Sequence, residues 1–170
     1  MTGAVIRSAG GEADVAFLGR MLCWAADWEA AQLDESALER PEVARYVEGW
    51  GRPGDTAVVA DKAGELVGAA WFRLFDANEP GYGFVDRRTP ELTIGVEPSH
   101  RGQGVGRALL DALCDSAREP GYPALSLSVE LDNPALRLYE SLGFERLERV
   151  GGAWTLVLRL SYPGSASDSK

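Results

Sequence analysis

A cluster of glycines at the junction between a strand and a helix constrains this chain more than any other feature. The segment EPSHRGQGVGRALLDAL runs from Glu97 to Leu113, and its stretch from Arg101 to Arg107 holds three glycines and two arginines. The preceding ELTIGV resembles a strand, and the following residues have an amphipathic helical pattern. Because glycine is costly inside regular structure, the cluster indicates a tight turn or a close approach to another group.

The cluster matches neither of two familiar phosphate-binding fingerprints. A dinucleotide fingerprint needs a small residue three positions after its second glycine, and that position falls here on Arg107 or Leu109. A P-loop needs a Gly-Lys-Ser/Thr ending, which the segment lacks. Glycine-permitted turns at a helix start nevertheless expose unpaired N–H groups, which bind anions. On this segment alone, glycines that merely allow a helix to pack closely on a strand are an equal alternative.

Length and periodicity predict one α+β domain. The chain has 170 residues, of which 45% are hydrophobic and 25% charged, as in an ordinary globular domain. Strands outnumber helices and alternate with them only in part, which argues against a simple doubly wound sheet. Residues 1–161 are expected to form the domain, and 162–170 a disordered polar tail. The expected strands are 3–9, 55–61, 65–75, 91–96, 124–130, 145–150 and 154–160, and the expected helices 12–31, 35–50, 105–118 and 133–144. Pro41 is a point at which the second of these helices could break or start.

Charge and cysteine content narrow the class of protein. The net charge of −9 argues against a nucleic-acid binder, and it fits either a cationic partner or solubility alone. Cys23 and Cys114 lie in apolar helical patterns, so we expect buried free thiols in a reducing compartment. No run approaches the roughly 18 apolar residues of a membrane span. The N-terminus lacks a signal-sequence pattern, so a cytoplasmic protein without a membrane partner is expected.

Two blocks of sequence together resemble the GNAT superfamily of N-acetyltransferases. The residues from Arg101 to Gly106, RGQGVG, are similar to that family's pyrophosphate-binding signature, Arg/Gln-x-x-Gly-x-Gly/Ala. The segment LSLSVELDNPALRLYESLGF resembles the family's next block, in which a strand and an Asn precede a helix that carries Leu-Tyr and ends in Gly-Phe. Both blocks occur in the family's order and spacing. The close match covers about residues 90–145, and the order of the elements extends it to most of the chain.

The resemblance implies an α+β fold with a mixed, mostly antiparallel sheet of about seven strands and helices on both faces. It also implies that the fourth and fifth strands splay apart and receive the pantetheine arm of acetyl-CoA, the co-substrate, with no metal ion. Asn133 precedes a proline, so a helix N-cap is an equally good role for it. The residues implied for contact with acetyl-CoA are Ile94, Gly95, Val96, Arg101, Gly102, Gln103, Gly104, Val105, Gly106, Arg107 and Asn133.

The same resemblance implies two catalytic residues. It places the hydroxyl of Tyr139 beside the CoA sulfur, where a phenol can protonate the leaving thiolate, although helical spacing also fits a core aromatic. An attacking amine must lose a proton, and Glu91 is the leading base because family members often hold a carboxylate there. Glu130 is the second choice, and either acid could be only a rim carboxylate. His100, the sole histidine, lies beside the phosphate loop, so a nucleophile triad is not expected.

The acceptor is left open by the sequence. The resemblance implies that the first two helices and the loop before the fourth strand line the site of the acceptor amine, and we call this lining the acceptor wall. Its residues here are aromatic and acidic, a set that would suit a cationic amine. The residues concerned are Trp24, Asp27, Trp28, Glu29, Tyr82, Phe84 and Asp86, and the two tryptophans fit a core position equally well. The expected function is transfer of an acetyl group from acetyl-CoA directly onto a primary amine of a small molecule or protein, by a monomer or homodimer. A non-catalytic acyl-CoA-binding or sensing module is the alternative.

Overall fold

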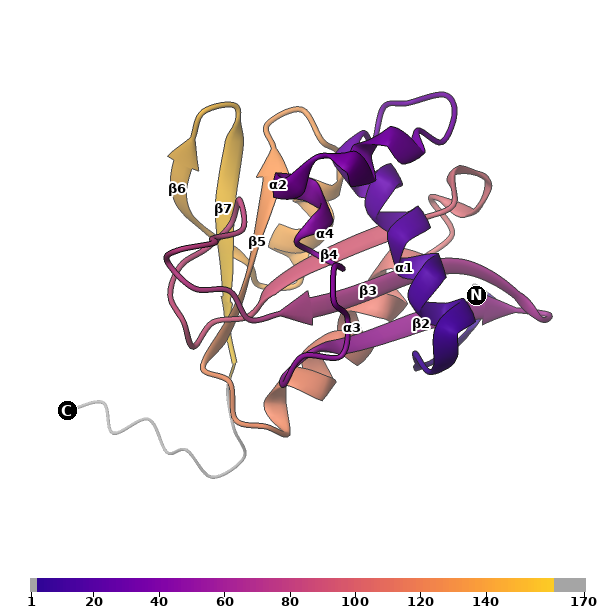
Figure 1. Cartoon of the computed structure of the whole chain (residues 1–170), viewed down its shortest axis with the longest axis horizontal. Helices are drawn as coiled ribbons and strands as arrows, with labels where there is room; N and C mark the ends of the chain where they lie inside the picture. Colours follow the sequence, from indigo (N-terminus) through magenta and orange to yellow (C-terminus); the bar gives the residue numbers. More distant parts are fainter. Residues whose placement is uncertain (1–2, 161–170) are drawn as a thin grey trace.

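A seven-stranded sheet with helices on both faces forms the centre of the structure, a computed structural model that describes residues 3–160 (Figure 1). The strand order is β1-β2-β3-β4-β5-β7-β6, and every neighbouring pair is antiparallel except β4 and β5. The elements are β1 (Val5–Ser8), α1 (Gly11–Ala26), η1 (Glu35–Glu39), α2 (Pro41–Ala44), β2 (Thr56–Lys62), β3 (Glu65–Arg73), β4 (Glu91–Val96), η2 (Pro98–His100), α3 (Val105–Arg118), β5 (Ala124–Glu130), α4 (Ala135–Ser141), β6 (Glu145–Val150) and β7 (Ala153–Arg159). The expected α+β fold class is confirmed.

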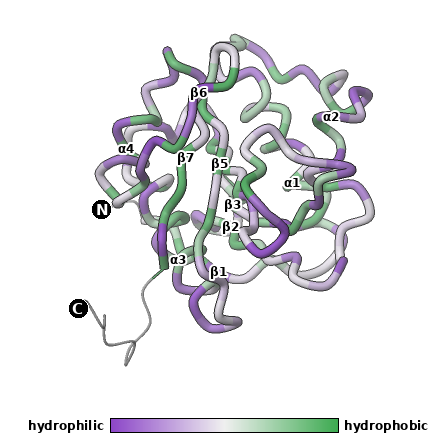
Figure 2. Tube along the Cα trace, turned by 90° about the vertical axis from the view of Figure 1, so that its left-hand side faces the viewer, coloured by the Kyte–Doolittle hydropathy of each residue, from purple (hydrophilic) through white to green (hydrophobic). Residues whose placement is uncertain are grey.

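The sheet separates two hydrophobic cores, and the strands divide their side chains between them. Leu109, Leu113 and Tyr139 from α3 and α4 belong to the first core, and Leu18 and Met21 from α1 belong to the second. In Figure 1, α1 and α2 cover one face while α3 covers the other. The most hydrophilic segments lie mainly at the periphery (Figure 2). Each large apolar side chain buried in this way stabilises the fold by about 1.5–3 kcal/mol.

The hairpin expected at residues 61–64 is present. Lys62 pairs with Glu65, so the loop between β2 and β3 consists of Ala63 and Gly64, with φ angles of +53° and +88°. Two consecutive residues with positive φ match the twist of a two-residue hairpin, and the Gly64 N–H also bonds the Asp61 carboxylate at 2.9 Å.

The helices near the N-terminus are shorter than the sequence pattern predicts. α1 ends at Ala26, and the expected helix 35–50 is replaced by η1 and the four-residue α2. Pro41 is the cause, because a proline lacks an N–H and holds the residue before it in an extended conformation, as at Arg40 (φ −86°, ψ 118°). Pro41 therefore begins a new helix instead of continuing the old one.

The second half of the chain follows the sequence pattern closely. α3, β5 and β6 have the expected bounds.

Other expectations concern the whole chain. Cys23 and Cys114 are buried and unpaired, as expected. Within residues 3–160, no helix is long and apolar enough to cross a membrane. The tail expected at 162–170 lies outside the described residues.

Candidate active site

The splay between β4 and β5 is the feature around which the candidate site is built. The two strands form one parallel pair, Glu91 with Ser126, and the Ser126 N–H bonds the Pro90 carbonyl at 3.0 Å. Beyond that pair, β4 stays with β3 and β5 stays with β7, so the strands diverge toward their carboxyl ends (Figure 1). Divergence leaves strand edges with backbone N–H and C=O groups free to bond a ligand.

The predicted phosphate loop has the backbone geometry of an anion site. Gly102 and Gly104 have φ angles of +75° and +87°, which a residue with a side chain adopts only with strain. Gly104 is the N-cap of α3 without a side-chain acceptor, and the first helical bond runs from the Ala108 N–H to its carbonyl at 3.2 Å. The amides of residues 105–107 therefore point out of a 14-residue helix with no carbonyl partner, which fits a pyrophosphate.

The side chains of this loop are used in different ways. Val105 is buried in the first core, so only its backbone can face a ligand. Gln103 is exposed and donates to the Ser99 carbonyl at 3.3 Å, and the exposed Arg107 donates to the Ser141 hydroxyl at 3.4 Å. A side chain at Gly106 would meet Leu138 at 3.5 Å, which is ordinary contact, so this glycine is not required by crowding.

Arg101 is bound to protein groups instead of projecting freely from the loop. Its guanidinium donates to the carbonyl of Val96 at 3.2 Å and to that of Trp28 at 3.1 Å, and it lies 5.5 Å from the centre of the Trp24 ring. In this arrangement Arg101 ties the end of α1 to the end of β4. Its contact with pyrophosphate stays a prediction.

The middle of β4 is shaped by its contact with α1. A side chain at Gly95 would lie 2.5 Å from the Met21 carbonyl oxygen, so only glycine allows α1 to approach the strand this closely. Ile94 and Val96, on the opposite face, pack against the first core. The contacts of these three residues with pantetheine remain untested.

Glu91 is a buried carboxylate at the base of the splay. It is 2% exposed, it accepts a hydrogen bond from the Tyr46 hydroxyl at Oε2, and it accepts another from the Gly83 N–H at Oε1 (3.1 Å). Burial raises the pKa of Glu91 to about 7, against the opposing effect of these two hydrogen bonds and of the Arg45 charge. A carboxylate with that pKa is well matched to accept a proton near neutral pH.

The sequence pattern did not point to Tyr46 as part of the site. It lies 45 residues before Glu91, in a segment expected to be helical, and no local motif marks it. The two glycines beside Tyr82 were the available signal, because glycine marks a close approach of backbone. A side chain at Gly81 would overlap the Glu91 carboxylate, and one at Gly83 would lie 2.5 Å from the backbone of Leu127.

Tyr139 lies on the first-core side of the sheet. It is 7% exposed, and its ring meets Phe144 edge-on with 5.9 Å between ring centres. Burial raises the pKa of the Tyr139 phenol, so the hydroxyl keeps its proton at neutral pH. No residue within 3–160 hydrogen-bonds this hydroxyl, which leaves it available as a donor.

Asn133 and Glu130 both have protein partners. The side-chain carbonyl of Asn133 accepts from the Ala135 N–H at 2.9 Å, in the turn that leads into α4. The N-cap of α4 is Pro134 and not Asn133, and the contact of Asn133 with the co-substrate stays a prediction. The Glu130 carboxylate accepts from the Trp28 indole N–H at 3.2 Å, a contact that joins the segment after α1 to the end of β5. Glu130 is exposed, unlike Glu91.

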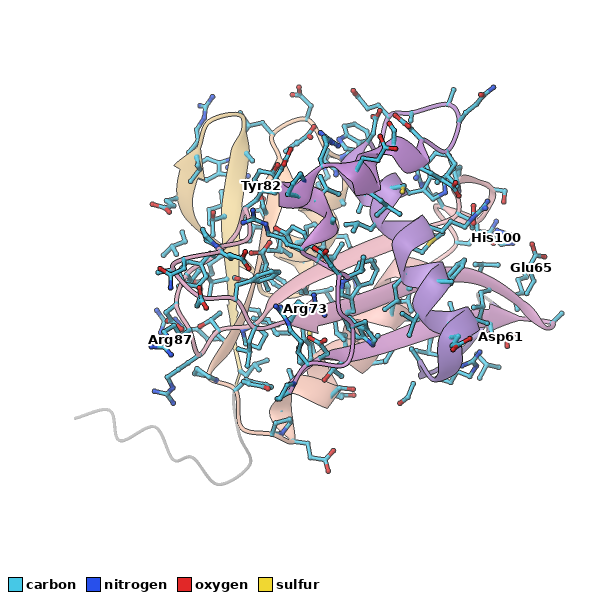
Figure 3. All side chains as sticks on the ribbon, in the orientation of Figure 1. Asp61, Glu65, Arg73, Tyr82, Arg87 and His100 are labelled. Carbon is cyan, nitrogen blue, oxygen red and sulfur yellow. The ribbon has the colours of Figure 1, made fainter. Side chains whose placement is uncertain are left out.

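The expected acceptor wall separates into buried and exposed parts. Trp24 is buried in the second core and Phe84 packs against it, whereas Tyr82 is 58% exposed. Trp28 is half-buried, and the exposed acids are Asp27, Glu29 and Asp86. Figure 3 shows Tyr82 near α2 and His100 at the opposite side of the molecule, where the His100 ring meets the Ser99 hydroxyl at 3.0 Å.

Two buried polar atoms at this site lack a protein partner. Within residues 3–160, the Trp24 indole N–H and the Ser126 hydroxyl are the buried side-chain polar atoms without a hydrogen bond. Ser126 is paired with Glu91 at the base of the splay, and Trp24 lies under Arg101 near the end of β4. Because buried polar groups are almost always satisfied, both atoms indicate a place where a ligand or water binds.

Comparison with known proteins agrees with this geometry. The L-amino acid N-acyltransferase of Escherichia coli is 32% identical over 153 residues, which cover 84% of both chains. The mycothiol acetyltransferase of Propionibacterium freudenreichii subsp. shermanii is 39% identical over 101 residues, covering 59% of this chain and 30% of that protein. The chain thus spans less than a third of the length of that mycothiol acetyltransferase.

Solved structures and a family model give the same result. A putative acetyltransferase from Salmonella typhimurium, solved with its cofactor acetyl-CoA, has a TM-score of 0.69 and 28% identity, with 99% of each chain covered. A ribosomal-protein-alanine N-acetyltransferase from Brucella melitensis has a TM-score of 0.68 and 29% identity over 92% of this chain and 99% of that one. The model of the acetyltransferase (GNAT) family matches residues 20–144. The chain therefore belongs to the GNAT family of acetyltransferases.

Proposed function

We propose that this protein is an N-acetyltransferase that moves the acetyl group of acetyl-CoA directly onto a primary amine. The observation that carries the proposal is the Glu91 carboxylate, which is buried at the base of the splay with its pKa raised to about 7. A buried carboxylate with a pKa near neutral is suited to accept a proton as a general base, which an exposed rim carboxylate is less able to do. The names of the relatives support the reaction class, and the Salmonella structure supports acetyl-CoA as co-substrate.

The proposed roles follow from the positions of the groups. The free amides of residues 105–107 and the glycine-rich turn bind the pyrophosphate, and the unpaired edge of β4 receives the pantetheine arm. Glu91 takes a proton from the acceptor ammonium, directly or through a water. The amine nitrogen then bonds to the thioester carbon, the carbon–sulfur bond breaks, and Tyr139 supplies a proton to the departing thiolate.

The acceptor side favours a cationic amine. Glu91 contacts Tyr46 in the segment after α2. Glu130 contacts Trp28 in the segment after α1, where Asp27 and Glu29 are exposed. Carboxylates placed in this way can attract an ammonium group.

The proposal is tested by CoA release with a panel of amines. The panel contains polyamines, aminoglycosides, L-amino acids and peptides with free amino groups, and the rate in water alone is the reference. We expect at least one amine to raise turnover well above that reference. Binding of acetyl-CoA without any stimulation by an amine would instead support a non-catalytic acyl-CoA sensor.

The identity of the base is tested by the pH dependence of turnover. Glu91→Gln keeps the shape of the side chain and removes its basicity, so turnover should fall at neutral pH and partly recover at high pH, where more acceptor is unprotonated. Glu130→Gln removes an exposed carboxylate and is the matched control. A wild-type pH–rate profile in Glu91→Gln would mean that Glu130 or solvent, and not Glu91, takes the proton of the amine.

A further inference from the structure

The Tyr46 hydroxyl connects three separate segments of the chain at the Glu91 carboxylate. It donates a hydrogen bond to Oε2 of Glu91 and accepts one from the Tyr82 N–H at 2.8 Å. The other carboxylate oxygen, Oε1, accepts from the Gly83 N–H at 3.1 Å. Each oxygen of Glu91 thus has one fixed donor, and the segment after α2 and the loop before β4 are joined through the same hydroxyl.

The backbone of Tyr46 is held in place by side chains of β3. The Trp71 indole N–H donates to the Tyr46 carbonyl at 3.0 Å, and Arg73 donates to the Arg45 carbonyl at 2.9 Å. Arg73 is itself fixed by a 2.7 Å ion pair with Asp55, and neither side chain is more than 2% exposed. Figure 3 shows Arg73 near the middle of the molecule. Tyr46 therefore presents its hydroxyl from a rigid support.

The loop leaves Glu91 no room to turn away from Tyr46. A side chain at Gly81 would overlap Oε1 of Glu91 and would lie 2.8 Å from the Tyr46 hydroxyl oxygen. The Tyr46 ring also meets Phe75 edge-on, with 5.2 Å between ring centres. Backbone, ring and carboxylate are packed together, so the Tyr46 hydroxyl stays within hydrogen-bond reach of the carboxylate.

The hydrogen bond from the Tyr46 hydroxyl is one of the effects that set the pKa of Glu91. Burial raises the pKa of Glu91, and the Tyr46 hydroxyl, the Gly83 N–H and the charge of Arg45 lower it. Arg73, opposite Glu91 on β3, is neutralised by Asp55, and Ser126 on β5 carries no charge. Burial and the Glu91 charge raise the pKa of Tyr46, so the phenol keeps its proton and continues to donate it.

We propose that Tyr46 is a positioning residue for the acetyl transfer: its hydroxyl holds one oxygen of the Glu91 carboxylate and favours the ionised form, which accepts the proton of the amine. This role rests on the proposed function of Glu91 as base. Tyr46 acts through its hydrogen bond to Glu91, and the contacts of its backbone with β3 hold the arrangement in place before substrate binds.

The test is the pH–rate profile of Tyr46→Phe, which removes one hydroxyl and keeps the ring. Loss of a charge-assisted hydrogen bond should raise the pKa of Glu91 by about one unit, so the acid limb of kcat/KM should move up by about one pH unit. With the starting pKa of about 7, kcat/KM at pH 7 should fall about five-fold and recover near pH 9. Affinity for acetyl-CoA should not change.

Tyr122→Phe is the matched control. The Tyr122 ring also meets a phenylalanine edge-on, with 5.7 Å between its centre and that of Phe72, but it has no contact with Glu91. Removal of the Tyr122 hydroxyl should therefore leave the acid limb in place. A merely structural role for Tyr46 would lower the melting temperature without moving the acid limb. An unmoved acid limb in a folded Tyr46→Phe protein would overturn the proposal.

A direct titration separates this inference from the proposed function. Carboxyl-labelled glutamate observed by NMR, with Glu91→Gln to assign the signal, reports the pKa of Glu91 in wild type and in Tyr46→Phe without any activity. A higher pKa in the variant supports the role of Tyr46, and an unchanged pKa contradicts it. If the pKa rises in Tyr46→Phe but Glu91→Gln keeps the wild-type rate profile, the role of Glu91 as base is contradicted, whereas the effect of Tyr46 on the pKa of Glu91 is supported.

Discussion

Tyr139 contributes a hydroxyl to a core that is otherwise apolar around it. Its ring packs against Phe144, which is the core role that helical spacing alone suggests. Phenylalanine would fill such a core position as well, since no residue within 3–160 hydrogen-bonds the Tyr139 hydroxyl. The hydroxyl is therefore free to donate to a group on the substrate, as the proposed reaction requires.

Tyr139→Phe tests that explanation. If the hydroxyl serves the leaving thiolate, kcat should fall by roughly 10²–10⁴, the usual scale for a general acid. Affinity for acetyl-CoA, measured by calorimetry, and the melting temperature should change little because the ring is kept. Wild-type turnover, with the chemical step limiting the rate, would return Tyr139 to a purely structural role.

At the scale of elements, the N-terminus of α3 performs two tasks with one backbone conformation. Gly104, with φ of +87°, ends the loop and begins the helix, and Val105 immediately anchors that helix in the first core. The turn thus fixes where the free amides point, relative to a helix that is itself held on the sheet. The side chains of Arg101 and Gln103 both bond carbonyl groups, so neither is bonded to these amides.

Gly104→Val should remove most of the affinity for acetyl-CoA while the protein stays folded. A branched side chain strains a residue with positive φ by about 1–3 kcal/mol and obstructs the approach of pyrophosphate to the amides. Gly121→Val is the matched control, because Gly121 has the same φ of +87° and open space around it, in the turn after the same helix. Calorimetric titration should show weak binding only in Gly104→Val. Equal losses in both variants would indicate general strain instead of a phosphate site.

At the scale of the whole molecule, Glu91 should make stability depend on pH. Its pKa is raised from 4.5 to about 7 in the folded state, so the folded protein binds a proton more tightly than the unfolded chain. Stability should then be highest below pH 4.5 as far as this group is concerned, and fall as pH rises from 4.5 to 7. The shift corresponds to about 3 kcal/mol of the free energy of unfolding.

Urea unfolding of wild type and Glu91→Gln at several pH values measures this contribution. The variant does not titrate, so its stability relative to wild type should increase by about 3 kcal/mol between pH 4 and pH 8. Glu130→Gln, an exposed control, should run parallel to wild type. Parallel curves for Glu91→Gln as well would mean that the burial of Glu91 does not perturb its titration.

Local sequence was sufficient for features that depend on neighbouring residues. Gly64 in the hairpin and the glycines in the turn before α3 have positive φ angles, which is the conformation that glycine adopts without strain. The alternation in β5 and the helical pattern of α3 reflect burial on one face, so their bounds were predictable. The helical pattern at 35–50 is interrupted at Pro41, where the sequence indicated that a helix could break or start, because the proline holds Arg40 in an extended conformation.

The sequence by itself determined that a glycine turn joins a strand to the start of a helix, because backbone conformation is a local property. Only the tertiary structure decided what surrounds Glu91, because burial and hydrogen bonding depend on segments that are distant along the chain. Tyr46, which follows α2 in the chain, donates a hydrogen bond to Glu91. Arg101 donates hydrogen bonds to the carbonyl groups of Val96 and Trp28. Such partners are chosen by the packing of α1, β3 and the loop before β4, and no residue spacing encodes them.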